Sequence, residues 1–187
     1  MKQIKEILDE ISNNFIELID QSTPNIQEAS KLIIGSLQNG KKIMFCGNGG
    51  SAADAQHLSA ELVGRYMKNR KPLASIALTT DTSVITAISN DFSFDKIFSR
   101  QVESIGNEGD ILYAISTSGK SENIIAALKT AKLLKIRTIG ITGNECADFN
   151  ELCDIIITVP ASRPDRIQEM HIAIGHIICE ILESKLC

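Results

Sequence analysis

The sequence predicts an α/β fold built on a parallel sheet of five strands. Five short runs are rich in apolar and β-branched residues, and helical patterns lie between most of them. The runs are KIMFC (42–46), ASIAL (74–78), ILYAIS (111–116), RTIGIT (137–142) and IIITVP (155–160). Most of them are unbroken rather than alternating, which is typical of strands covered on both faces. This βαβα order predicts a three-layer sandwich around an open sheet, with right-handed crossovers.

The helical segments frame this sheet. Apolar side chains recur at steps of three and four from Ile4 to Ile19, which predicts an amphipathic helix. Pro24 is expected to end that helix and to begin a second one, which runs to about Gln38 and closes at "NG". Further helices are expected over 52–68, 81–105, 121–135 and 164–186. We predict one domain over 1–187, with N-terminal helices over about 1–40, a sheet core over about 41–160 and a C-terminal helix over about 164–186.

Composition narrows the class of ligand. The formal net charge of −4 argues against a broad nucleic-acid-binding or membrane-binding face, since both usually need a basic excess. A phosphorylated metabolite is still allowed, because backbone N–H groups hold phosphate without net positive charge. No apolar run approaches the ~20 residues of a membrane span, and the N-terminus lacks the apolar core of a signal peptide. The five cysteines lack a CxxC pair and predict reduced thiols in the cytoplasm (Cys46, Cys146, Cys153, Cys179 and Cys187).

Ligands of such sheets bind beyond the carboxyl ends of the strands, so the segment after the first strand is informative. There GNGGSAAD begins at Gly47, and its glycines let the backbone approach a ligand closely. Ser51 is expected to cap the next helix, whose N-terminus attracts anions. The segment also matches G-x-G-x-x-A, but the candidate ribose-binding acid, Asp81, lies about 34 residues on rather than about 20. We therefore expect no nucleotide cofactor.

The third strand ends in a second turn suited to an anion. Hydroxyls and helix N-terminal amides together form a phosphate cradle that needs no lysine. Four hydroxyls surround Gly119, from Ser116, Thr117, Ser118 and Ser121. A serine-rich loop with one capping serine explains this turn equally well when it is taken alone. Two such turns at neighbouring strand ends favour one small phosphorylated ligand.

Two further groups have more than one interpretation. Asn90 and Asp91 are either binding residues or the end of a helix and its turn. His57 and Glu61 are four residues apart and share a helix face, so they suit a metal, an acid–base pair or a simple surface pair. On the last helix, Gln168 and His176 diverge by about 80° and can line one broad stripe. Spacing does not decide whether His176 is a ligand or a satisfied core histidine.

Four segments resemble the phosphoheptose isomerases of the sugar isomerase (SIS) family across nearly the whole chain. They are CGNGGSAADAQHLSAELVGRY, SNDFSFDKIFSRQVE, ISTSGKSENI and PDRIQEMHIAIGH. The resemblance implies a flavodoxin-like sandwich and a homotetramer with sites between subunits. It also implies interconversion of sedoheptulose 7-phosphate and D-glycero-D-manno-heptose 7-phosphate, a precursor of lipopolysaccharide or a related surface glycan.

The resemblance also implies roles for individual residues. Glu61 and His176 are the implied catalytic pair. Zinc is the implied ion, with ligands His57, Glu61, Gln168 and His176. The implied substrate-binding residues are Asn48, Gly49, Gly50, Ser51, Asn90, Asp91, Ser116, Thr117, Ser118, Ser121, Asp165 and Gln168.

Two other classes stay open. The DnaA initiator-associating protein is a non-catalytic relative that shares the glycine turn, and the resemblance implies that it lacks the matching Glu and His. Both Glu61 and His176 are present here, which favours the isomerase. A sugar-phosphate sensor, or an isomerase of another sugar phosphate, is the second alternative.

Overall fold

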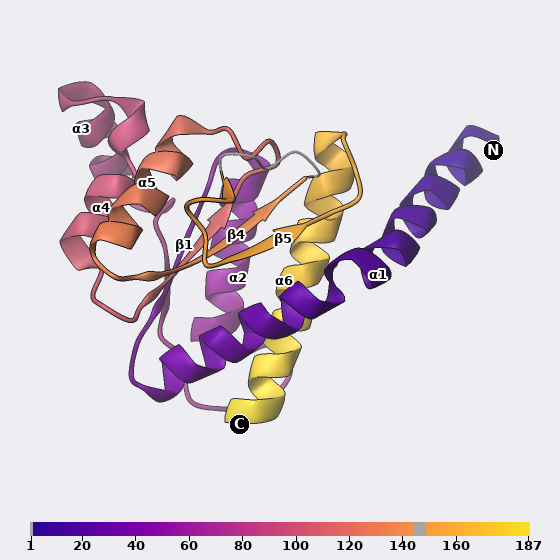
Figure 1. The fold of residues 1–187 in the computed structure, drawn as a ribbon, viewed down its shortest axis with the longest axis horizontal. Helices are drawn as coiled ribbons and strands as arrows, with labels where there is room; N and C mark the ends of the chain where they lie inside the picture. Colours follow the sequence, from indigo (N-terminus) through magenta and orange to yellow (C-terminus); the bar gives the residue numbers. More distant parts are fainter. Residues whose placement is uncertain (1, 144–148) are drawn as a thin grey trace.

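The strands form one parallel sheet in the order β2–β1–β3–β4–β5 (Figure 1). The computed structural model describes residues 2–143 and 149–187. The strands are β1 (Ile43–Gly47), β2 (Ser75–Ala77), β3 (Ile111–Ile115), β4 (Arg137–Thr142) and β5 (Ile155–Thr158). In register, Phe45 of β1 lies between Ala77 of β2 and Tyr113 of β3. Each predicted apolar run overlaps one strand, so the prediction of an α/β fold on a five-stranded parallel sheet is confirmed.

Helices cover both faces of the sheet. They are α1 (Lys2–Gln38), α2 (Gly50–Val63), α3 (Thr82–Asp91), the short 3-10 helix η1 (Phe94–Lys96), α4 (Ser99–Ile105), α5 (Glu122–Leu133) and α6 (Pro164–Leu186). Strand side chains alternate between the two faces, so Phe45 packs with α1, α2 and α6, whereas Met44 packs with the α3–α5 layer. α2 and α6 therefore share one face of the sheet, although 100 residues (64–163) separate them.

The N-terminal helix differs from its prediction. Pro24 lies inside α1, which is one continuous helix rather than two. Proline removes one backbone donor, but contacts with the edge strand β5 hold this part of the helix in place. The side chain of Ser22 donates to the carbonyl of Thr158, and Asn25 Nδ2 donates to the carbonyl of Ile156 at 2.6 Å. Contacts with β5 thus outweigh the tendency of Pro24 to end the helix.

Two other helices differ from their predictions in the opposite way, because the predicted segments contain shorter helices. The helix predicted over 52–68 ends at Val63, and in the loop that follows the backbone N–H groups of Tyr66, Met67 and Lys68 donate to the side chain of Glu183 on α6 instead of continuing the helix. The helix predicted over 81–105 is divided into α3, η1 and α4, and the break between α3 and η1 contains an extended residue, Ser93, with φ −170° and ψ 162°. The predicted closure of α1 is confirmed, since Gly40 adopts φ +71° directly after it.

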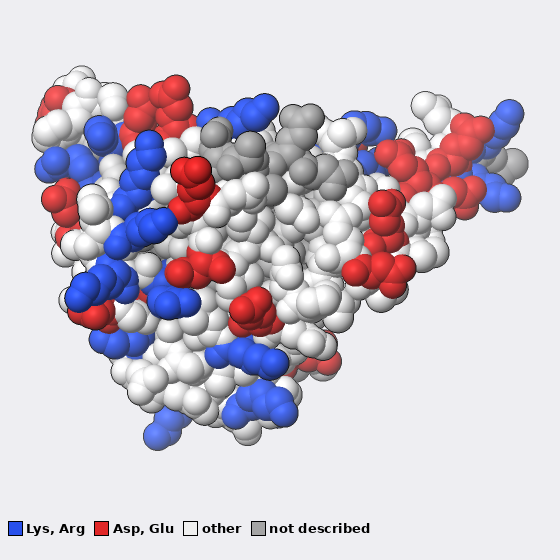
Figure 2. All heavy atoms as spheres, in the orientation of Figure 1, with Lys and Arg blue, Asp and Glu red and all other residues white. Residues whose placement is uncertain are grey.

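The surface is mixed in charge. Figure 2 shows acidic side chains along the projecting end of α1, and lysines and arginines over the side of α4 and α5 with acids among them. No described helix is long and apolar enough to cross a membrane. None of the four described cysteines forms a disulfide, in line with the expected reduced thiols, whereas Cys146 lies outside the described residues.

Candidate active site

The turn after β1 leads into α2, and no described side chain caps the start of that helix. Gly49 is the residue before α2 and has φ +54°, a conformation that favours glycine. The expectation that Ser51 caps this helix is wrong, because Ser51 is buried inside its first turn. A Cβ on Gly50 would lie 2.5 Å from Nε2 of Gln168, so the amide of Gln168 rests against the start of α2. The glycine turn therefore lets α6 reach the strand end.

The turn after β3 is held by its own hydroxyls. Ser116 Oγ accepts from the Gly119 N–H at 3.2 Å and lies 3.3 Å from Ser121 Oγ. Ser118 Oγ accepts from the Lys120 N–H, also at 3.2 Å. Ser121 is the residue before α5, whose free N-terminal N–H groups and dipole favour an anion. The chain here forms a polar concave turn with little side-chain bulk.

A pair of amides joins the two turns. Asn48 Nδ2 donates to Asn123 Oδ1, and Asn123 Nδ2 donates to Asn48 Oδ1, each at 2.8 Å. Asn123 is only 2% exposed, so this pair fixes the position of the β1 turn against the first turn of α5. Sequence reasoning missed Asn123. The available signal was a polar residue directly before the apolar run IIAAL, on the inner side of the serine turn.

An open pocket of about 470 Å³ adjoins the serine turn. Its walls come from the ends of β3 and β4 and from the segment that leads from β5 into α6. The lining residues are Thr117, Ser118, Lys120, Gly143, Ala161, Ser162 and Ile167. A pocket beyond the carboxyl ends of parallel strands is the usual ligand position in such sheets.

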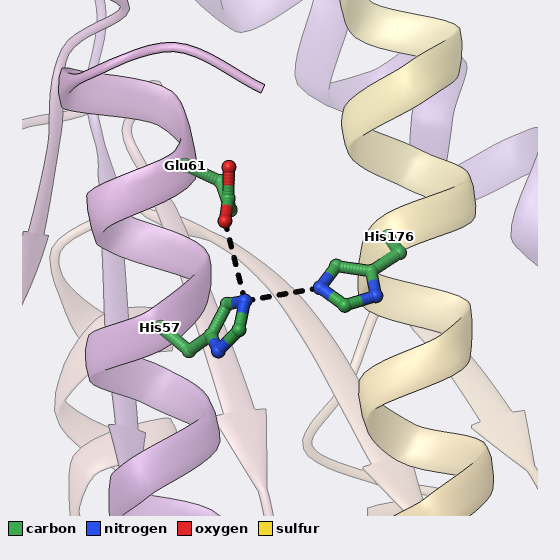
Figure 3. A group of neighbouring side chains, drawn as sticks. All are labelled: His57, Glu61 and His176. Carbon is green, nitrogen blue, oxygen red and sulfur yellow. Dashed lines mark hydrogen bonds and ion pairs between the residues drawn. The ribbon is translucent and has the colours of Figure 1, made fainter. Parts of the chain in front are cut away.

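The second polar group lies between α2 and α6 (Figure 3). The Nε2 atoms of His57 and His176 are 3.0 Å apart, and His57 Nε2 lies 3.2 Å from Oε1 of Glu61. One ligand atom from each residue falls within 4.8 Å of the others. The Glu61 side chain is 24% exposed, so a small molecule can reach it. Two imidazoles and a carboxylate suit a divalent metal as well as proton transfer.

Close helix packing brings these side chains together. Gly175 directly precedes His176, and a Cβ on it would lie 2.4 Å from Cδ2 of Leu58, the neighbour of His57. The absence of a side chain at 175 therefore allows α2 and α6 to approach. On the open side, the ring of Tyr66 lies 5.7 Å from the ring of His176. Partial burial, with Glu180 and Glu61 nearby, raises the pKa of Tyr66, so its hydroxyl stays protonated at neutral pH.

The other histidine of α6 belongs to the core. His171 is 1% exposed, and burial lowers its pKa to about 4, with a smaller opposite effect from the Thr142 backbone. It is therefore neutral at physiological pH. His176, by contrast, is half-buried and faces α2. The structure thus shows that His176 is not a core histidine, a question that spacing alone left open.

Residues 6–143 match the family model described as SIS domain. The chain is 51% identical over 183 residues to the phosphoheptose isomerase of Aliarcobacter butzleri, a match that covers 98% of this chain and 96% of that protein. Solved phosphoheptose isomerases from Neisseria gonorrhoeae and Francisella tularensis align with TM-scores of 0.92 and 0.95, at 40% and 38% identity, over 98% of each chain.

The chain belongs to the phosphoheptose isomerase family of SIS-domain proteins. This confirms the resemblance. In this phosphoheptose isomerase family member, Asp81, the candidate ribose-binding acid of the sequence analysis, caps a helix instead. It precedes α3, and its Oδ1 accepts from the Val84 N–H at 3.0 Å.

Within one chain of this phosphoheptose isomerase family member, the predicted site residues do not all lie close together. Asn90 and Asp91 are exposed at the end of α3, in the layer opposite α2 and α6, and bond to each other at 2.9 Å. Asp165 is exposed at the start of α6 and pairs with Arg163 at 2.6 Å. Gln168 contacts Gly50, about 12 Å along α6 from His176 by helical rise. Their predicted roles stay predictions.

Proposed function

We propose that this protein is a phosphoheptose isomerase that interconverts sedoheptulose 7-phosphate and D-glycero-D-manno-heptose 7-phosphate. The observation that carries the proposal is the grouping of His57, Glu61 and His176, in a chain about half identical to proteins of that name. Aldose–ketose isomerisation moves a proton between C1 and C2 through a cis-enediol, which requires a base and a second proton-transfer group. Glu61 and His176 supply those two kinds of group.

The phosphate is proposed to bind at the serine turn. Ser116, Thr117, Ser118 and Ser121 surround Gly119 there, and the pocket of about 470 Å³ opens beside them. Binding energy at the phosphate end holds the distant carbonyl end in register with the base. The remaining proposed sugar contacts come from the β1 turn, from α3 and from the start of α6. They are Asn48, Gly49, Gly50, Ser51, Asn90, Asp91, Asp165 and Gln168.

Proton transfer is assigned to two side chains. Glu61 takes the proton from one carbon and returns it to the neighbouring carbon. His176 approaches from the other helix and moves hydroxyl protons. The Nε2–Nε2 distance of 3.0 Å between His57 and His176 means that one ring donates to the other when no ion lies between them. His57 Nε2 carries either a proton or a lone pair, so it either donates towards its two neighbours or accepts from His176 alone.

The same three side chains fit a metal ion. Two imidazole nitrogens and one carboxylate oxygen within 4.8 Å match the ligand types that zinc takes in catalytic sites with an open position. We propose zinc, which supplies polarisation of the sugar carbonyl when bound. Gln168 stays a predicted further ligand. Elemental analysis of the purified protein, with activity measured before and after chelation and zinc return, tests this. Full activity in a metal-free preparation would show that the reaction does not require zinc.

We also propose a cytoplasmic homotetramer of single-domain chains, with sites between subunits. The support is the arm of α1, where Ile4, Ile16 and Ile19 are each more than 60% exposed and suit a subunit contact. Asn90 and Asp91 point into solvent within one chain, as residues completed by a neighbour would. Sedimentation and scattering in solution test the assembly. The product is proposed to enter lipopolysaccharide or a related surface glycan.

A panel of ketose phosphates tests the function. The purified protein is offered sedoheptulose 7-phosphate, fructose 6-phosphate and ribulose 5-phosphate, and aldose formation is followed by NMR. We expect turnover of the heptulose with kcat/KM at least ten times that of the others. Binding without turnover of any sugar indicates a sensor. If the protein neither binds nor converts any of the sugars but captures a replication initiator, it belongs to the adaptor class.

A further inference from the structure

The loop that follows α2 is tied to α6 by one buried carboxylate. Glu183 is 2% exposed, and its oxygens accept four hydrogen bonds at 2.9 Å. Three come from consecutive backbone N–H groups, those of Tyr66, Met67 and Lys68, and the fourth comes from Nε of Arg70. Burial alone raises the pKa of Glu183, but these donors lower it to about 2. The carboxylate is therefore ionised and fully partnered.

Arg70 continues this connection to the other helix. Its guanidinium donates from Nη2 to the carbonyl of Glu61 at 2.7 Å and from Nη1 to the carbonyl of Leu62 at 2.8 Å. These carbonyls belong to the last turn of α2, which has no partners within the helix. The Arg70 side chain is 3% exposed. One buried cation thus joins the end of α2, at the residue that bears the proposed base, to a carboxylate on α6.

The geometry relates this connection to the histidine–carboxylate group. Glu183 follows His176 by seven residues, so both side chains leave nearly the same face of α6 about 10 Å apart along the helix. Tyr66, whose N–H is held by Glu183, presents its ring to His176 at 5.7 Å. The Arg70–Glu183 pair therefore links α6 to the backbone at the end of α2 and in the loop that follows, and it contacts none of the reacting groups.

We propose that Arg70 and Glu183 are positioning residues for the isomerase reaction. They set the spacing between α2 and α6 that brings Glu61 against His176, and they hold Tyr66 over His176. The inference rests on the proposed function in so far as Glu61 and His176 carry out the proton transfer. It adds two residues that do not touch the substrate.

Two variants break the connection in different ways. Glu183→Gln keeps the size of the side chain but removes the charge and turns one acceptor into a donor against the backbone N–H groups. Arg70→Lys keeps the charge, but an ammonium on a linear stem does not span Glu183 and both α2 carbonyls. We expect kcat to fall about 10- to 100-fold in both, with KM changed less than about threefold, as for a small misplacement of reacting groups.

Asp110→Asn is the matched control. Asp110 is also 2% exposed and accepts from the N–H groups of Lys42 and Asn107 and from the Lys42 ammonium, directly before the central strand β3. It is expected to lower the melting temperature while leaving kcat within about twofold of the parent. All kinetics are measured well below the lowest melting temperature. Equal kcat in Glu183→Gln, Arg70→Lys and Asp110→Asn overturns the proposal.

A spectroscopic readout separates positioning from stability. The chain has two tyrosines and no tryptophan, so in a Tyr113→Phe background the fluorescence reports Tyr66 alone. Acrylamide quenching of Tyr66 is expected to rise at least twofold in Arg70→Lys and Glu183→Gln and to stay unchanged in Asp110→Asn. This readout does not depend on turnover. A parent protein that lacks isomerase activity overturns the proposed function, whereas unchanged quenching overturns the positioning role.

Discussion

The two polar regions of the molecule are built in opposite ways. The serine turn takes its groups from one contiguous stretch, Ser116 to Ser121, and from backbone N–H groups. The His57–Glu61–His176 group takes its side chains from two helices that meet only in the folded protein. The first region depends on local turn chemistry, and the second depends on how closely α2 and α6 pack.

This difference assigns different tasks to the two regions. A turn of hydroxyls and amides suits a constant charge such as phosphate, which is bound equally in the ground state and the transition state. Side chains on rigid helices suit the reacting carbons, where small displacements matter. Changes in the turn are therefore expected to alter mainly KM, and changes in the helix-borne group mainly kcat.

The largest effect is expected from Glu61→Gln. The amide keeps the shape of the side chain but cannot accept the substrate proton, so kcat is expected to fall at least ~100-fold, the low end of general base catalysis. Single-turnover NMR in deuterated solvent measures proton exchange at C1 and C2 separately from binding. Near-parental exchange in a folded Glu61→Gln protein would remove Glu61 from its role.

Gly175→Ala tests the packing between the helices. The new methyl group meets Leu58 at the closest approach of α2 and α6 and is expected to separate His176 from His57. We expect kcat to fall about tenfold, with KM little changed.

Gly35→Ala is the control for that substitution. Gly35 lies inside α1 with open space around its Cβ position, so alanine there is expected to stabilise the protein by about 0.5–1 kcal/mol without changing kcat. Parental kcat in Gly175→Ala would show that the spacing of the two helices does not limit the reaction.

Asn123→Ala tests the other region. Its loss removes both hydrogen bonds of the Asn48 side chain to Asn123 and loosens the glycine turn against the serine turn. The expected result is a rise in KM of about five- to tenfold, with kcat within about threefold, since the phosphate is held less firmly. Steady-state kinetics measure both constants. A fall in kcat at unchanged KM would reverse the division between the two regions.

The smallest effect is a change of stability with pH. The pKa of Glu183 is lowered from its ordinary value of 4.5 to about 2 in the folded protein. Its ionised form therefore contributes stability above pH 4.5, and this contribution is lost as the pH falls from 4.5 towards 2. The gap in melting temperature between the parent and Glu183→Gln should shrink over that window. Glu6→Gln, in an exposed pair with Lys2, should show no gap.

Strand positions and the two turns were predictable because their signals are local. Apolar runs covered on both faces, left-handed glycines and serine-rich turns depend on a few neighbouring residues. Asn123 and Gly175 were missed for the opposite reason. The partner of each, Asn48 for the first and Leu58 for the second, lies far away in the sequence.

By itself the sequence determined the order of strands and helices, the two polar turns at the strand ends and the likeness to phosphoheptose isomerases. Only the tertiary structure decided that α1 continues through Pro24, that His176 rather than His171 faces α2, and that Glu183 ends α2 early. Side-chain periodicity specifies which faces of a helix are apolar. It does not specify which helices meet, because that choice is made by packing between distant segments.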